Sequence, residues 1–358
     1  MMSCLQLGLM VANALVVMAA ASVLELDQAS PSILTDVAKD CSFKIHLEGV
    51  EWLVGGMGRV YLDGKWHSKL DHTLSLSKAA VSHSGVDLLG SFTEVTCNWT
   101  AGQTPVITAV RTYSGRSATM FQITFPRGAL STNASVPDPT WGKYGPNTDG
   151  VQPFAEFPAF DMDEGRASNA SFMTWHGGLQ YHDEAQGQVR RGKGWYGTYL
   201  HNLTGMSLGP MVIFDEASAA PFTTVVVSPA SNIRTGAAVV RPRENAHSPE
   251  LVWAHGPSWE LTSVPAGFTQ STAVVAGSGV RSGLESWGHL LLDAHNTTRR
   301  RDPSLQYLGV FTDNGAFYDA GYWPSWKGRK NANAVFKALS QSYLAADIPT
   351  KYLQLDDW

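Results

Sequence analysis

Short runs of alternating apolar and polar residues, separated by turn residues, fill most of the chain between residues 41 and 292. β-branched and aromatic residues dominate these runs, and a period of two is typical of half-buried strands. The Asp63-Gly64 pair between two of the runs favours a hairpin turn. No helix longer than two turns is expected in this region. The sequence therefore predicts a mainly β fold, with a large amino-terminal β-sandwich over residues 22–300. The clearest strand-like runs are residues 43–47, 59–62, 106–110, 121–125, 211–214 and 223–227.

One segment inside this region looks different. Residues 134–165 are rich in Pro, Gly and Asp and are expected to form a long loop. An aromatic and proline-rich stretch, residues 153–160, interrupts the loop. We expect this stretch to pack as part of the loop; the alternatives are that it packs onto a neighbouring domain or reaches over a site.

After Asp302 the hydrophobic pattern changes from one typical of antiparallel strands to one typical of parallel strands. Residues 307–312 form a continuous apolar run of the kind buried in parallel sheets. Residues 333–346 carry apolar side chains at helical spacing, and residues 351–355 read as a second strand. Strand, helix and strand make one βαβ unit over residues 303–358, with parallel strands. One such unit cannot bury both of its faces. Because the chain stops at Trp358 without a turn or cap, we expect a partial gene product that holds the start of a larger parallel sheet or barrel.

The amino terminus resembles an export signal. Leu5 to Leu26 is almost entirely apolar and passes through small residues, which predicts a signal peptide over residues 1–21. The lack of Lys or Arg before this stretch leaves a retained signal anchor open, and no later segment approaches the length of a membrane span. We expect a secreted protein or one of the endomembrane lumen (extracellular, vacuolar or lysosomal). Five N-x-[ST] sequons agree with this and are the expected glycosylation sites: Asn98, Asn133, Asn169, Asn202 and Asn296.

Two cysteines remain if Cys4 leaves with the signal. Cys41 and Cys97 would then form an even pair that an oxidising compartment can join in a disulfide. Two buried thiols are the alternative. Neither cysteine has the spacing of a metal ligand.

Charge and motifs exclude several classes of function. Lys+Arg 26 against Asp+Glu 31 gives a net charge of −5, which disfavours nucleic-acid binding. Gly192–Gly197 fits G-x-G-x-x-G, but it leads into a strand-like run and not into a helix. Gly205–Gly209 fits G-x-S-x-G, but Pro210 follows it and excludes a nucleophile elbow. The histidines show no metal-ligand pattern. No cofactor and no metal are expected.

The candidate site lies just beyond the two carboxy-terminal strands. Asp313 follows the first strand, and Asp356, Asp357 and Trp358 follow the second. In βα architectures the residues past the carboxyl ends of the strands line the site. Carboxylates with aromatic side chains and no cationic cluster suit a neutral polyol. The alternative is a helix-capping Asp pair with aromatic residues packed at a domain interface. The aromatic residues of the first loop are Phe317, Tyr318, Tyr322, Trp323 and Trp326.

Residues 307–318 and 348–358 resemble the first two barrel strands of the α-galactosidase and raffinose synthase group of glycoside hydrolases. The resemblance implies a β-sandwich followed by a (β/α)8 barrel, here apparently truncated after the second barrel strand. It implies that Asp356 and Asp357 bind hydroxyls of a terminal galactose, and that Asp313 with Tyr318 lines the pocket. The family usually carries a Trp where Thr312-Asp313-Asn314 stands in this sequence. The resemblance therefore does not specify which sugar is the substrate. The family's nucleophile and general acid belong to later strands, so the resemblance implies no catalytic residue within these 358 residues.

The sequence is compatible with three functions. The first is a secreted carbohydrate-active enzyme that hydrolyses or transfers α-galactoside-like glycosides by a retaining mechanism. The second is a secreted or surface carbohydrate-binding β-sandwich protein without catalysis. The third is a related hydrolase that prefers α-glucosides. The expected partner is an oligosaccharide or glycoside substrate, with no nucleic acid and no membrane span after signal cleavage.

Overall fold

The structure is a computed structural model, and it describes residues 31–133, 152–162, 164–165, 170–175, 184–189, 210–215, 223–242, 251–311 and 332–354. The chain divides into two compact units, the first ending at Asn296 and the second beginning at Thr297. The fold is mainly β, as the sequence predicts. The expected signal peptide lies outside the described residues. Among the described helices, none combines the length and the apolar character that crossing a membrane requires.

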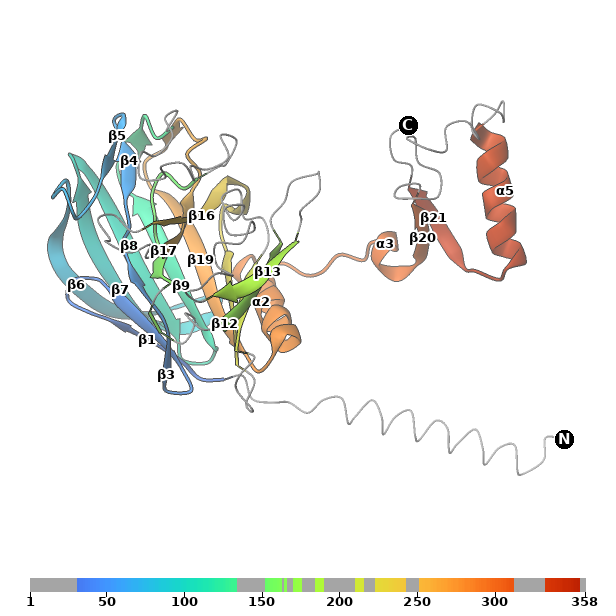
Figure 1. The fold of residues 1–358 in the computed structure, drawn as a ribbon, viewed down its shortest axis with the longest axis horizontal. Helices are drawn as coiled ribbons and strands as arrows, with labels where there is room; N and C mark the ends of the chain where they lie inside the picture. Colours follow the sequence, from blue (N-terminus) through green and yellow to red (C-terminus); the bar gives the residue numbers. More distant parts are fainter. Residues whose placement is uncertain are drawn as a thin grey trace, which may run out of the picture. The chain divides into compact units, whose positions relative to one another are not determined.

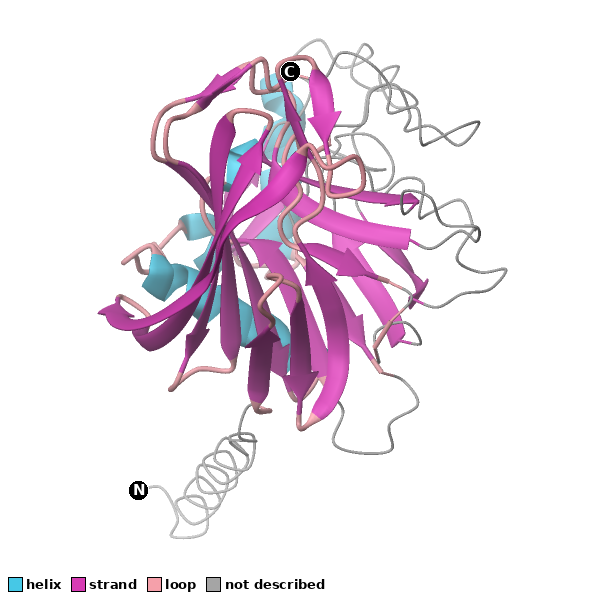
Figure 2. Cartoon of the chain, turned by 90° about the vertical axis from the view of Figure 1, so that its left-hand side faces the viewer, coloured by secondary structure: helices cyan, strands magenta, loops and turns pink. Residues whose placement is uncertain are grey.

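Two antiparallel sheets build the first unit and face each other (Figures 1 and 2). The six-stranded sheet has the order β1 (Ile33–Val37), β2 (Phe43–Leu47), β3 (Val50–Gly56), β11 (Ala159–Asp161), β17 (Leu251–Pro257) and β16 (Gly236–Pro242). The nine-stranded sheet has the order β13 (Glu184–Val189), β12 (Ala170–Trp175), β14 (Met211–Phe214), β15 (Thr224–Pro229), β19 (Phe268–Gly277), β9 (Ala118–Phe125), β8 (Thr104–Tyr113), β7 (Gly90–Ala101) and β6 (Leu74–Asp87). β10 (Ala129–Leu130) follows β9 in the sequence, and β18 (Ser263–Val264) precedes β19. These two short strands form a separate antiparallel pair.

Aromatic side chains fill the space between the sheets. Phe43 of β2 lies 4.6 Å, centroid to centroid, from Phe121 of β9, and 5.7 Å from Phe160 of β11. All three are fully buried, and each such ring contributes about 1.5–3 kcal/mol through removal of apolar surface from water. Cys41 and Cys97 form a disulfide in the structure, with an S–S distance of 2.08 Å, and both are buried. Since Cys41 follows β1 and Cys97 lies on β7, this bond ties the two sheets together.

A predicted hairpin is confirmed next to this core. β4 (Val60–Leu62) pairs with β5 (Lys65–His67) in antiparallel register. Asp63 and Gly64 form the turn, with φ angles of 52° and 81°. Positive φ at both central residues is the geometry that the Asp-Gly dipeptide favours.

The expectation of no helix longer than two turns before residue 292 is wrong. Helix α2 (Val280–Ala294) runs for 15 residues and packs on the face of β14, β15 and β19 that is turned away from the six-stranded sheet (Figure 1). Val280, Leu284, Trp287 and Leu291 recur at helical spacing and make this contact. The signal was obscured by the glycines at 283 and 288, which lower helix propensity. Gly283 allows the helix to approach the sheet, because a Cβ there would lie 3.2 Å from Cγ2 of Val226.

The expectation of a loop over residues 134–165 is also wrong in part. β11 lies in the middle of the six-stranded sheet and pairs with β3 on one side and β17 on the other. Its three residues give no periodicity of their own, and its partners lie about a hundred residues away in either direction along the chain. Residues 153–158, which precede it, are buried.

The second unit contains the predicted βαβ arrangement. A short helix, α3 (Pro303–Gln306), is capped by the Asp302 carboxylate, which accepts a hydrogen bond from the Ser304 amide at 2.8 Å. Strand β20 (Leu308–Phe311), helix α5 (Ala332–Ala345) and strand β21 (Thr350–Gln354) follow. β20 and β21 pair in parallel, with Phe311 opposite Gln354. The expected strand, helix, strand and parallel pairing are therefore confirmed.

Candidate functional site

The strand-end residues expected to bind substrate, Asp313, Tyr318, Asp356, Asp357 and Trp358, lie outside the described residues. The structure does describe the strands that precede them. β20 and β21 end at one edge of their sheet, because the strands are parallel and their last residues, Phe311 and Gln354, are partners. Asp313 is two residues after Phe311 in the sequence, and Asp356 is two residues after Gln354.

The sequons have different surroundings. Asn169 and Asn202 lie outside the described residues. Asn98 is half-buried within β7, whereas Asn133 and Asn296 are exposed.

A cavity of about 470 Å³ lies on the six-stranded sheet, on the face opposite to the core side chains Phe160 and Trp253. A row of cross-strand neighbours forms its floor: Asp161 of β11 pairs with Val54 of β3 and with Val252 of β17, which in turn pairs with Arg241 of β16. Gly55 and Gly56 of β3, Gly58 of the β3–β4 connection and residues 68–70 complete the lining. The floor therefore combines two apolar side chains, Val54 and Val252, with two charged ones, Asp161 and Arg241.

A buried ion cluster supports one wall of this cavity. The carboxylate of Glu156, which is fully buried, accepts hydrogen bonds from Nε and Nη2 of Arg241 at 2.8 and 2.6 Å. It also accepts bonds from Nε and Nη2 of Arg59 at 3.2 and 3.1 Å, and from the Arg59 amide at 3.0 Å. Both arginines are buried as well. A buried carboxylate needs such partners, since an unpaired charge in the interior is strongly destabilising.

Local sequence explains how the cluster is held. The Arg59 guanidinium carbon lies 4.2 Å from the centroid of the Trp66 ring, which adds a cation–π contact from the β4–β5 hairpin. The Gly58 amide donates to the Glu156 carbonyl at 2.9 Å, and a Cβ at Gly58 would collide with the Glu156 side chain. Glycine at 58 therefore permits the close approach of the two segments.

The pKa of Glu156 fixes its chemical role. Burial raises the pKa of this carboxyl, but the charges of Arg241 and Arg59 outweigh burial and lower the pKa to about 2. Glu156 is therefore ionised at neutral pH and is neither a proton donor nor an effective base there. The ionised carboxylate balances charge on the two guanidinium groups to which it is bonded.

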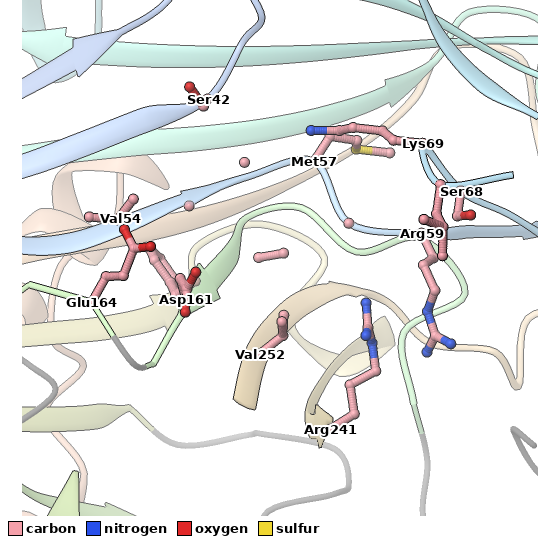
Figure 3. Close-up of a pocket in the computed structure, with 16 residues that line it drawn as sticks. Ser42, Val54, Met57, Arg59, Ser68, Lys69, Asp161, Glu164, Arg241 and Val252 are labelled. Carbon is pink, nitrogen blue, oxygen red and sulfur yellow. The ribbon is translucent and has the colours of Figure 1, made fainter. Parts of the chain in front are cut away.

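Charged groups of opposite sign line different sides of the cavity. In Figure 3 the carboxylates of Asp161 and Glu164 lie on one side, and the cationic groups of Lys69 and Arg241 lie on the other. Acceptors and donors on opposite sides suit hydroxyl groups, which both donate and accept hydrogen bonds. Within the described part of the chain, no cluster of His, Cys, Asp or Glu could hold a metal ion.

Sequence reasoning did not find this cluster. The available signal was Glu156 itself, a single acid inside the apolar run of residues 153–160. A lone charge in such a run indicates a buried ion with a partner. The partners Arg59 and Arg241 are 97 and 85 residues away and have no local signature.

No protein-family profile and no curated protein matches the chain in sequence. Solved structures do match in shape. One is an α-N-acetylgalactosaminidase from Bifidobacterium bifidum in complex with GalNAc, with 8% identity and a TM-score of 0.47 over 91% of this chain and 50% of that one. Another is a GH36 α-galactosidase from Geobacillus stearothermophilus in complex with stachyose, with 7% identity and a TM-score of 0.38 over 78% and 45%. A galactose mutarotase-like protein from Lactobacillus casei matches with 10% identity and a TM-score of 0.32 over 69% and 97%. The chain spans about half the length of the two glycoside hydrolases.

Proposed function

We propose that this protein is a carbohydrate-active enzyme that hydrolyses or transfers α-galactoside-like glycosides by a retaining mechanism. The observation that carries the proposal is the parallel pairing of β20 and β21, joined through α5, after a large antiparallel sandwich. Parallel strands bring their carboxyl ends to one edge, where βα architectures bind their substrates. The sequence beyond both strands supplies acids and aromatic residues at that edge.

We assign substrate binding to these residues. Asp356 and Asp357 are adjacent in the sequence, and we assign to their carboxylates the hydrogen bonds from vicinal hydroxyls of the sugar. Asp313 contributes a third carboxylate from the neighbouring strand. Tyr318 and Trp358 offer an apolar surface to the less polar face of the sugar ring.

We assign no catalytic role to this set. Retaining hydrolysis requires two carboxylates about 5–5.5 Å apart on opposite sides of the scissile bond. Asp356 and Asp357 follow one strand as sequence neighbours and cannot flank a bond in this way. The nucleophile and the general acid are assigned to none of the 358 residues.

We further propose that the protein works outside the cytosol, either secreted or in the endomembrane lumen. The apolar amino terminus and the sequons support this. The buried Cys41–Cys97 disulfide adds support, because structural disulfides persist mainly in oxidising compartments.

The test is hydrolysis of nitrophenyl glycosides by the full-length gene product. We expect nitrophenol release from the α-galactoside and not from the α-glucoside. Release from the α-glucoside alone would favour the related hydrolase. The stereochemistry of the first product, followed by NMR, tests the retaining mechanism.

The cavity on the six-stranded sheet favours a second candidate, a carbohydrate-binding sandwich without catalysis. Its donors and acceptors suit hydroxyl groups, and Glu156 pairs its two buried arginines. Glycan-array binding by this chain that is lost in an Asp161→Asn variant would support this function. An Asp36→Asn variant is the control, since Asp36 lies on β1 and does not line the cavity.

A further inference from the structure

Two sequons lie wholly within the described residues: Asn98-Trp99-Thr100 and Asn296-Thr297-Thr298. Sequence alone treats them as equivalent glycosylation sites. We propose that Asn296 carries an N-linked glycan and that Asn98 stays unmodified. The inference rests on the proposed export of the protein, because the transferase acts in that compartment.

Asn296 is presented to solvent at the end of a helix. It follows α2 with a φ of 46°, and its amide donates to the Asp293 carbonyl at 3.0 Å. Its side chain is exposed, and so are all residues from 297 to 306. Residues 297–302 belong to no helix or strand, so the sequon can adopt the conformation that a transferase site requires without loss of a strand or helix.

Asn98 is held inside a sheet. It lies on β7 between Lys78 of β6 and Ile107 of β8, and it is half-buried. A glycan there would have to leave the surface between the side chains of two flanking strands.

The residues beside Asn98 are fixed as well. Cys97 is bonded to Cys41. Trp99 is buried and donates from Nε1 to Oγ1 of Thr108 at 2.9 Å. Oγ1 of Thr100, the hydroxyl that completes the sequon, lies 2.6 Å from Oγ of Ser77. To bring Asn98 into the active site of a transferase, β7 would have to separate from its neighbouring strands. The hydrogen bond from Trp99 to Thr108 and the contact between the Thr100 and Ser77 hydroxyls would then be lost.

The modification is a glycosyl transfer from an oligosaccharide linked to a lipid diphosphate. The side-chain nitrogen of Asn296 attacks the anomeric carbon, and a C–N bond forms while the bond from that carbon to the diphosphate oxygen breaks. The lipid diphosphate leaves with the electron pair, and the amide nitrogen gives one proton to a base. The product is a neutral, bulky and solvated surface group.

Such a group at Asn296 would shield a basic run. Arg299, Arg300 and Arg301 are exposed and begin three residues after Asn296. Exposed basic residues outside regular structure are preferred cleavage sites for trypsin-like proteases. We expect enzymatic deglycosylation to accelerate tryptic cleavage at this run.

The test uses the full chain produced in eukaryotic cells. Treatment with peptide N-glycosidase in heavy-oxygen water labels each occupied Asn, and peptide mapping then reports every sequon separately. We expect label at Asn296 and none at Asn98. Thr298→Ala should abolish the label at Asn296, whereas the matched variant Thr297→Ala, which keeps the sequon, should retain it. Thr100→Ala should leave the pattern unchanged.

Two results would overturn the inference alone: label at Asn98, or an unlabelled Asn296 in molecules labelled at Asn133, Asn169 or Asn202. A chain that carries no label and remains accessible to protease outside sealed microsomes would overturn the proposed export together with this inference.

Discussion

Phe311 of β20 lies opposite Gln354 of β21, and the two strands run in the same direction. These are the last residues of their strands, so the chain leaves both strands at one edge of the sheet. Asp313 and Asp356 each stand two positions further on. This register is the basis for assigning one polyol-binding edge to residues 43 positions apart in the sequence.

Removal of the charge on either strand-end acid should weaken turnover of an α-galactoside. We expect Asp356→Asn and Asp357→Asn each to lower kcat/KM about 10- to 100-fold, since hydrogen bonds to charged groups contribute about 1.5–3 kcal/mol. The measurement is steady-state hydrolysis of nitrophenyl α-galactoside by the full-length gene product. Asp302→Asn is the control, because Asp302 caps α3 and should leave kcat/KM unchanged. Wild-type kinetics in both variants would contradict the assignment.

Neutralisation of Glu156 should destabilise the first unit. A Glu156→Gln variant removes the buried negative charge to which Arg59 and Arg241 both bond, which costs about 3–5 kcal/mol in the free energy of unfolding. Urea unfolding followed by tryptophan fluorescence measures the change. The control is Glu51→Gln, which removes a partly exposed pair with Lys44 and should have little effect. Equal midpoints for the two variants would exclude a stabilising role for the cluster.

His255 should make stability depend on pH. The side chain is buried against Trp253, with ring centroids 4.5 Å apart, and burial lowers its pKa from 6.5 to about 3. The unfolded chain therefore binds a proton at a higher pH than the folded chain does. The stability contributed by neutral His255 is complete above pH 6.5 and declines as the pH falls toward 3.

The pH effect is best measured between pH 6.5 and 5, above the usual titration range of Glu156. We expect the free energy of unfolding to fall across this interval in the wild type, and to fall less in a His255→Gln variant. The control His289→Gln changes an exposed histidine and should keep the wild-type slope. An unchanged slope in His255→Gln would show that another group causes the decline.

Loss of the disulfide should destabilise the sandwich through the unfolded state. The bond closes a sequence separation of 56 residues, for which chain entropy gives about 4 kcal/mol. We expect the double variant Cys41→Ala, Cys97→Ala to show this loss in urea unfolding. Wild-type protein unfolded in the presence of a thiol should match the variant. A variant as stable as the oxidised wild type would contradict the expectation.

Local patterns predicted the elements whose signal is contained in a few residues. The alternation of residues 43–47 and the Asp63-Gly64 turn specify β2 and the β4–β5 hairpin by themselves. The apolar spacing of Val335, Leu339 and Tyr343 does the same for α5. These elements depend on neighbours close in sequence, and they were predicted correctly.

The missed elements depend on distant partners. β11 has three residues and becomes a strand because β3 and β17 pair with both of its edges. Helix α2 contains two glycines that lower its intrinsic propensity, and its packing against β15 and β19 compensates. Glu156 is 97 residues from Arg59 and 85 residues from Arg241 in the sequence, and only the tertiary structure brings the three side chains together. No local window of sequence contains these interactions.

We propose that the substrate is a glycoside of the α-galactoside type. Parallel assays of the full-length gene product on nitrophenyl α-galactoside and nitrophenyl α-glucoside, with the Asp356→Asn variant beside the wild type, test it most directly. We expect nitrophenol release from the α-galactoside only, and a slower release by the variant. Release from the α-glucoside only, or from neither substrate, would contradict it.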